Sequence, residues 1–184
     1  MLVARAKADP RAFAALYRRY VERVYRYCYR RLGTREAAED ATAAVFARAL
    51  AGLPGLREGP FRGWLFAIAH NAIVGEFRQR AARPERGLDE AAEVVDPGDG
   101  PAEAALAGEA RASVLGLLPR LPEEQRRVLE LRLAGLSGPE IGHALGRSHG
   151  SVRVAQYRAI RRLRALLGEG ERRTAGRSEE ETDG

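Results

Sequence analysis

Cysteine is almost absent from this chain of 184 residues, which contains only Cys28. A single cysteine excludes an internal disulfide and a cysteine-based metal cluster. Aromatic residues are only 7% of the total, and runs of β-branched residues are scarce. No apolar run approaches the roughly 20 residues that cross a bilayer, and the N-terminal apolar stretch is too short for a secretory signal. We therefore expect a cytoplasmic protein without membrane insertion.

What is abundant is Ala, Leu, Arg and Glu, a mixture that favours helices. The net charge is +6 and the pI about 10.1. Basic residues outnumber acidic ones over 1–83 and 111–167, whereas acidic residues dominate 84–110 and 168–184. Two basic blocks on either side of an acidic spacer favour two modules that bind nucleic acid. The alternative is that the basic helices are merely solvated.

The first block predicts three helices. Asp9-Pro10 starts the first, Gly33 ends it, and Thr34 caps a second that runs to about Leu50. The third starts near Phe61, ends at 78–80 and is broken by the proline at 84. The apolar positions recur at helical spacing: Phe13, Leu16, Tyr17, Tyr20, Val24, Cys28 and Leu32, then Ala38, Ala41, Val45 and Ala49, then Trp64, Leu65, Ile68, Ala72 and Ile73.

Residues 84–100 combine Pro, Gly and acidic residues without an apolar period, which predicts a flexible acidic linker. Helices are expected from Pro101 to Leu118 and again after Pro122. Residues 168–184 are polar and aperiodic, so we expect a disordered tail. The predicted organisation is an all-α chain with two small helical domains, 1–83 and 101–167.

A helix-turn-helix is predicted near the C-terminus. Ser137 and Glu140 are spaced for a capping box, Gly146 permits a tight turn, and Ser148 caps a long basic helix. On a helical wheel, the last helix is amphipathic. Its apolar side contains Val152, Ala159, Leu163 and Leu166, and the opposite side contains Arg153, Val154, Tyr157, Arg158, Arg161 and Arg164.

These segments resemble bacterial RNA polymerase sigma factors of the extracytoplasmic-function (ECF) group. The second sigma region is similar to residues 13–17, 38–42 and 61–71, and the fourth is similar to 121–167. Residues 150–160 are closest to the developmental, BldN-like sigma factors of filamentous actinobacteria. The resemblance implies a region 2 three-helix bundle and a region 4 helix-turn-helix. It also implies binding to core RNA polymerase and promoter DNA, and the family often has an anti-sigma factor clamped between its two domains.

The resemblance implies specific site residues. The last helix would read the −35 element in the major groove, with Arg153 and Tyr157 best placed for bases and the other arginines for phosphates. The implied −35 set is Arg147, Ser148, His149, Ser151, Arg153, Tyr157, Arg158 and Arg161. The implied set for the melted −10 element is Trp64, His70, Asn71, Arg78 and Arg80, with packing as the alternative for Trp64. Asp40 and Phe46 are the implied polymerase contacts.

The chain departs from the family pattern at Ala43, Ala44, Gly75 and His70. No catalytic residue, metal or cofactor is expected, because His70, His143 and His149 lack the spacing of metal ligands. Two alternatives stay open. One is a helix-turn-helix regulator that works without polymerase, and the other is a degenerate sigma factor that titrates an anti-sigma factor.

Overall fold

The computed structural model describes residues 2–57, 59–82 and 112–180, and it describes side chains as far as residue 169. Every regular element in these ranges is a helix, as the composition predicts. The predicted linker, 84–100, and the first part of the helix expected from residue 101 lie outside the described residues. The described chain divides into two compact units. One contains the residues up to 82 together with 130–152, and the other contains 112–129 together with 153–180.

The first unit begins with α1 (Leu2–Ala8), a short helix that the sequence analysis did not anticipate. Asp9 then accepts a hydrogen bond from the Arg11 N–H at 2.9 Å and caps the 3₁₀ turn η1 (Pro10–Ala12), which leads into α2 (Phe13–Leu32). Gly33 ends α2 in the left-handed region, with φ of 81°. The helix boundaries in this stretch therefore follow the predicted capping residues.

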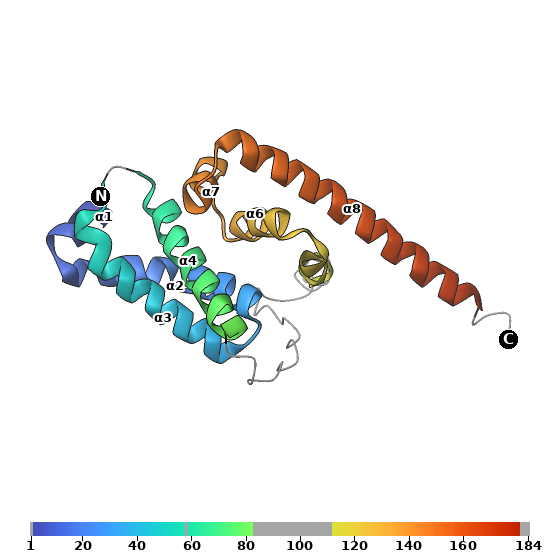
Figure 1. The fold of residues 1–184 in the computed structure, drawn as a ribbon, viewed down its shortest axis with the longest axis horizontal. Coiled ribbons are helices and arrows are strands. Elements are labelled where there is room, and N and C mark those ends of the chain that lie inside the picture. Colours follow the sequence, from blue (N-terminus) through green and yellow to red (C-terminus); the bar gives the residue numbers. More distant parts are fainter. Residues whose placement is uncertain (1, 58, 83–111, 181–184) are drawn as a thin grey trace. The chain divides into compact units, whose positions relative to one another are not determined.

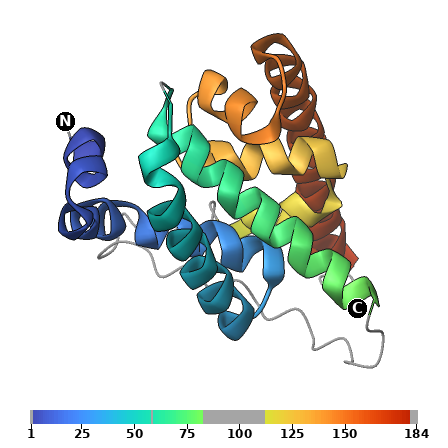
Figure 2. The same cartoon turned by 60° about the vertical axis from the view of Figure 1, so that its left-hand side comes forward.

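Three long helices form the core of the first unit. Thr34 caps α3 (Arg35–Gly52), the turn η2 (Leu53–Gly55) follows, and α4 (Phe61–Ala82) is the third. α2, α3 and α4 pack against one another (Figures 1 and 2). Each large apolar side chain that is fully buried there contributes roughly 1.5–3 kcal/mol. The most deeply buried residues include Leu16, Val24, Tyr27, Ala38, Val45, Ala49, Leu65, Phe66 and Ile73.

The second part of the chain contains a helix over residues 112–117, the turn η3 (Leu118–Arg120), α6 (Glu123–Leu133), α7 (Gly138–Leu145) and α8 (His149–Glu180). In the second unit, an apolar cluster joins the segment around η3 to one side of α8. It is made of Leu115, Leu118, Leu121, Leu129, Ala159 and Leu163.

The compact units do not coincide with the two halves expected from the sequence. α7 belongs to the first unit, where it packs against α4 (Figures 1 and 2). The contact joins residues about 80 positions apart along the chain, which no periodicity can reveal. It brings the first helix of the helix-turn-helix onto the helix that carries the predicted −10 residues.

The expected disordered tail is a correction. α8 continues past Gly168 to Glu180, and only residues 181–184 of that segment lie outside the described residues. The physical reason is local propensity. The segment after Gly168 is rich in Glu and Arg, which are good helix formers, and no proline follows Pro139. A segment without an apolar period can therefore still be helical.

Candidate nucleic-acid interface

The turn before α8 is built on two glycines. Gly146 ends α7 with φ of 63°, in the left-handed region that favours glycine. The Arg147 N–H then donates to the Gly142 carbonyl at 2.8 Å. A Cβ added to Gly142 would lie 2.7 Å from the Arg147 carbonyl oxygen, so only glycine fits there. Together these contacts close the turn between α7 and the first residues of α8.

The predicted serines at the start of α8 serve first as caps. The Ser148 hydroxyl accepts from the Ser151 N–H at 3.2 Å, and the Ser151 hydroxyl donates to the Ser148 carbonyl at 2.9 Å. Both residues remain exposed. His149 is also exposed, and its ring lies against Gly138, because a Cβ there would meet the ring nitrogen Nε2 at 2.7 Å. The first turn of α8 is thus held by local hydrogen bonds while its side chains stay exposed to solvent.

The amphipathic division of α8 is confirmed. Val152 and Ala159 are fully buried and Leu163 is 9% exposed. Tyr157, on the opposite side, is 64% exposed, and the Arg161 guanidinium lies over its ring at 5.9 Å from the centroid. The remaining predicted residues of this region are exposed: Arg147, Arg153 and Arg158. The combination of arginines and an open aromatic ring suits contact with a polyanion.

Val154 was placed on the open side of the wheel but was not assigned a role. It is 49% exposed, which is unusual for a large apolar side chain, and it directly follows the basic Arg153. Apolar groups on a recognition helix contact the methyl group of thymine. Its place beside Arg153 on the outward side of the helical wheel was the signal that could have selected it.

α4 presents part of its predicted set to solvent. Asn71, Arg78 and Arg80 are exposed. Arg80 is already engaged, since its Nε pairs with Glu76 at 3.2 Å and its Nη1 donates to the Leu32 carbonyl at 3.4 Å. Asn71 and Arg78 are therefore the exposed members of the set that lack the ties that hold Arg80.

His70 is less accessible than the sequence analysis expected. It is 9% exposed and its Nδ1 lies 3.4 Å from the buried Tyr27 hydroxyl, so its ring packs in the helical bundle, and its contact with −10 DNA stays a prediction. Trp64 is half-buried, packed beside Phe61 with ring centroids 5.8 Å apart and close to Gly52, where an added Cβ would lie 3.2 Å from the Trp64 ring. Most of the Trp64 ring therefore packs against other residues, as the alternative to a DNA contact expected.

The two predicted polymerase contacts differ in accessibility. Asp40 is exposed on α3, whereas Phe46 is only 5% exposed. The Phe46 ring packs edge-on against Tyr17 at 4.8 Å and against Phe13 at 6.3 Å between ring centroids, and its polymerase contact stays a prediction. Tyr17 covers it and is 44% exposed. The accessible aromatic group at this point is therefore Tyr17, which the sequence analysis assigned to the core.

The described part of the chain was also searched for a reactive thiol, a metal site and a membrane-spanning helix. Burial raises the pKa of the Cys28 thiol to about 11, so the thiol is protonated at neutral pH. Among the residues described, no cluster of His, Cys, Asp and Glu is suited to hold a metal ion. None of the described helices is both long and apolar enough to span a membrane.

The comparisons with known proteins agree with these features. Residues 16–83 match the model of Sigma-70 region 2, and residues 111–163 match that of Sigma-70 region 4. The ECF RNA polymerase sigma factor ShbA of Streptomyces griseus is 42% identical over 154 residues, which cover 77% of this chain and 80% of that protein. This chain belongs to the ECF group of RNA polymerase sigma factors.

Two further similarities support the family assignment of this sigma factor. The ECF sigma factor BldN of Streptomyces coelicolor is 35% identical over 90% of this chain, which spans 64% of the length of BldN. The resemblance to BldN-like factors is thereby confirmed. Among solved structures, CnrH in complex with the cytosolic domain of CnrY aligns with a TM-score of 0.66 and 27% identity, covering 91% of this chain and 96% of CnrH. The match to region 2 also accounts for the N-terminal helices, which a plain helix-turn-helix regulator leaves unexplained.

Proposed function

We propose that this sigma factor binds core RNA polymerase and directs it to promoters, with α8 reading a −35 element and α4 holding an opened −10 element. The observation that carries the proposal is α8, whose apolar side is buried while its other side presents arginines and the 64% exposed Tyr157. Bond formation belongs to the polymerase. The chain supplies binding and positioning, in the cytoplasm where polymerase and promoter meet, and it needs no cofactor.

For the −35 element, the first turns of α8 lie in the major groove. Arg153 is the base-reading residue, because an Arg can donate two hydrogen bonds to guanine at a gain of roughly 1–3 kcal/mol over a wrong base. Val154 contacts a thymine methyl. Arg158 and Arg161 pair with phosphates, and the ring of Tyr157 keeps the Arg161 guanidinium oriented. The exposed Arg147, His149 and the serine caps lie at the end of the helix that enters the groove.

For the −10 element, the exposed Asn71 and Arg78 of α4 are the contacts we favour. The amide of Asn71 can pair with the edge of an unstacked base, and Arg78 can follow the phosphates of the single strand. Arg80 adds positive charge while its guanidinium stays hydrogen-bonded to the Leu32 carbonyl of α2. The exposed edge of Trp64 offers a surface for base stacking near the turn that follows α3.

For polymerase, we propose a contact through α3 that is centred on the exposed carboxylate of Asp40 and the partly exposed ring of Tyr17. Ala43 is exposed nearby in the sequence but carries no charge. The contact is therefore centred on an exposed carboxylate and an aromatic ring, and it is expected to be sensitive to ionic strength.

The test is transcription in vitro with purified core polymerase, followed by sequencing of the RNA starts. Starts that share two upstream elements, and that appear only when both polymerase and this chain are present, support the proposal. Specific binding to duplex DNA without any polymerase dependence would instead support a helix-turn-helix regulator. Polymerase binding without starts on any promoter would indicate a degenerate factor.

A further inference from the structure

α1 is tied to a turn that lies 49 positions further along the chain. Lys7, near the end of α1, donates a hydrogen bond from its Nζ to the carbonyl of Leu56, the residue that directly follows η2. Lys7 is the only lysine in a chain that otherwise uses arginine for positive charge. An ammonium group is compact and carries three rotatable donors, so it can direct one of them at a single carbonyl oxygen. The bond joins the first helix to the segment that precedes α4.

The rest of α1 keeps Lys7 within reach of that carbonyl. Ala6 is buried, and α1 packs against α2, η1 and η2. The Asp9 N–H donates to the Arg5 carbonyl at 2.9 Å, and the Asp9 side chain caps η1, so the chain is held directly after α1 as well. The helix end that carries Lys7 is therefore fixed by contacts that do not involve the lysine side chain.

η2 lies against the ring of Trp64. The Leu56 N–H donates to the Leu53 carbonyl at 3.1 Å, which closes η2, and the Leu53 side chain is buried. Gly52, at the start of η2, faces the indole, because a Cβ added there would lie 3.2 Å from Trp64 Cζ2. The residue that Lys7 holds thus belongs to the turn that packs against Trp64.

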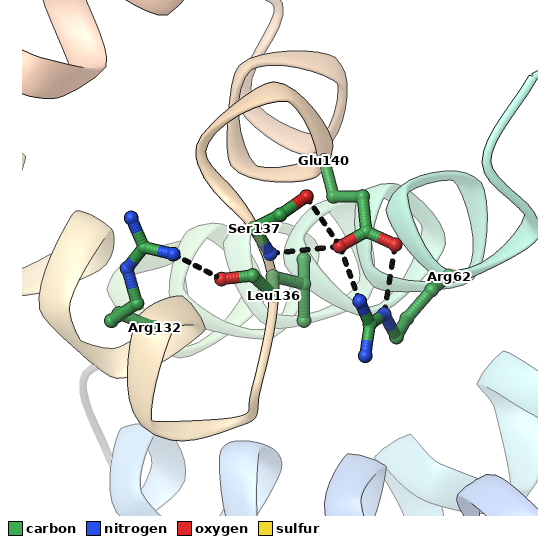
Figure 3. A network of polar contacts seen from close by, with 5 residues as sticks. All are labelled: Arg62, Arg132, Leu136, Ser137 and Glu140. Carbon is green, nitrogen blue, oxygen red and sulfur yellow. Dashed lines mark hydrogen bonds and ion pairs between the residues drawn. The ribbon is translucent and has the colours of Figure 1, made fainter.

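The first turn of α4 is fixed by contacts of its own. Arg62 donates from Nε to Glu140 Oε1 at 2.8 Å and from Nη2 to Oε2 at 2.6 Å (Figure 3). Within the predicted capping box of α7, Oε2 also accepts from the N–H and the hydroxyl of Ser137, at 2.7 Å each (Figure 3). Chiefly because of the bonds from Arg62, the pKa of Glu140 falls to about 2. A two-pronged Arg–carboxylate pair fixes orientation as well as distance, so a movement beside Trp64 would come from η2 rather than from α4.

The placement of the Trp64 ring decides what the proposed −10 surface offers to a base. The indole is half-buried and lies between Phe61, with ring centroids 5.8 Å apart, and Gly52. Only its exposed part can meet an unstacked base. Stacking is favoured when the ring is already held in one orientation, because binding then has little side-chain motion left to restrict. A displacement of η2 would remove the support at Gly52 and release the ring.

We propose that Lys7 is a positioning residue for the −10 element, because it holds η2 through Leu56 and so keeps the exposed edge of Trp64 in the orientation that meets an unstacked base. The inference rests on the proposed function for its effect on DNA, whereas the effect on the ring belongs to the free chain. Lys7 itself contacts no base, since its ammonium group is engaged by the Leu56 carbonyl. α1 is thereby part of the −10 surface without touching DNA.

The test uses three variants of the full chain. Lys7→Met removes the ammonium donor and keeps an unbranched side chain of similar length. Its matched control is Arg5→Met, which removes an exposed positive charge from the same helix and leaves the backbone bond to Asp9 in place. Lys7→Arg keeps a charged donor at the same position and is the rescue variant. Circular dichroism checks that each variant keeps its helix content.

Fluorescence of the free chain is the first measurement, because Trp64 is the only tryptophan in the chain and therefore the only indole that reports. We expect Lys7→Met to raise the population in which η2 has left the ring about fivefold, so that acrylamide quenches the indole more efficiently. Arg5→Met should match the wild type, and Lys7→Arg should lie close to it. Equal quenching in Lys7→Met and wild type would overturn the proposal, as would an equal increase in Lys7→Met and Arg5→Met.

DNA binding by each chain in complex with core polymerase is the second measurement. A promoter identified by its RNA start supplies two probes, one single-stranded through the −10 element and one duplex that carries only the −35 element. Lys7→Met should weaken binding to the opened probe about fivefold and leave the −35 duplex unchanged, and Lys7→Arg should restore most of the loss.

The two measurements separate the possible failures. If Lys7→Met exposes Trp64 but binds the opened probe as tightly as wild type, the lysine holds the ring without positioning it for DNA, and the proposal is overturned. Equal weakening on both probes would also overturn it, because the effect would not belong to the −10 element. If the wild type binds neither probe with polymerase, the proposed function fails and the role in DNA binding fails with it, while the quenching still decides whether Lys7 holds the ring.

Discussion

Replacing Glu140 by glutamine removes the charge that joins α4 to α7 while keeping the side chain's size. The Arg62 pair and the Ser137 bonds to Glu140 lose their anionic acceptor. Lowering a pKa from 4.5 to about 2 corresponds to about 3 kcal/mol by linkage. Because water screens the pair in part, we expect the actual loss of unfolding free energy in Glu140→Gln to be about 1–2 kcal/mol at pH 7.

The pH dependence of this loss follows from the sign of the shift. The folded-state pKa is depressed, so the ionised carboxylate stabilises the protein above the unfolded value of 4.5. That contribution is lost as the pH falls toward 2. The difference between wild type and Glu140→Gln should therefore be largest above about pH 5.5, and less than half of it should remain near pH 3.

Urea unfolding of both proteins at pH 7, 5, 4 and 3, followed by circular dichroism, measures the difference. The pH dependence of the penalty is diagnostic, because a purely structural effect of the amide would be the same at every pH. An equal penalty at pH 7 and pH 3, or no penalty at pH 7, would refute the reasoning.

Three substitutions and one labelling experiment test other parts of the structure. Arg31→Ala breaks the buried ion pair with Glu130, so thermal unfolding should show a loss of unfolding free energy of about 3–5 kcal/mol. Arg153→Ala should weaken −35 duplex binding by roughly 1–3 kcal/mol on the preferred sequence only; equal weakening on every duplex in a binding assay would make it a phosphate contact. Asp40→Ala should reduce polymerase affinity in a pull-down while leaving −35 duplex affinity of the full chain unchanged. Cys28 should resist a thiol reagent at pH 8 in the folded protein and react in urea, since burial keeps its pKa near 11; rapid reaction when folded would contradict this.

Helix ends and helix faces were predictable because both depend on neighbouring residues. Asp9, Gly33 and Thr34 act where expected, each by bonding or backbone conformation within three or four positions. The exposed and buried sides of α8 follow the helical period for the same reason. The length of α8 was underestimated, because the apolar period was used as the sign of a helix where intrinsic propensity was sufficient.

The candidate site was only partly predictable. Residues at the start of α8 remain accessible, whereas His70 and Phe46 are covered by Tyr27 and Tyr17. Matching a residue to a family motif gives its position on a helix but not what packs over it. The DNA and polymerase contacts of the accessible residues remain predictions.

The order of residues alone determined that this chain is helical, where most helices start and stop, and that two basic blocks occur. These properties arise from local bonding and from repeats of three to four residues. Only the tertiary structure decided that Arg62 meets Glu140, that Arg31 is buried with Glu130, and that Gly63 lies against α7. Such pairs are set by how whole helices pack, because side chains far apart in sequence become neighbours only when their helices share an interface.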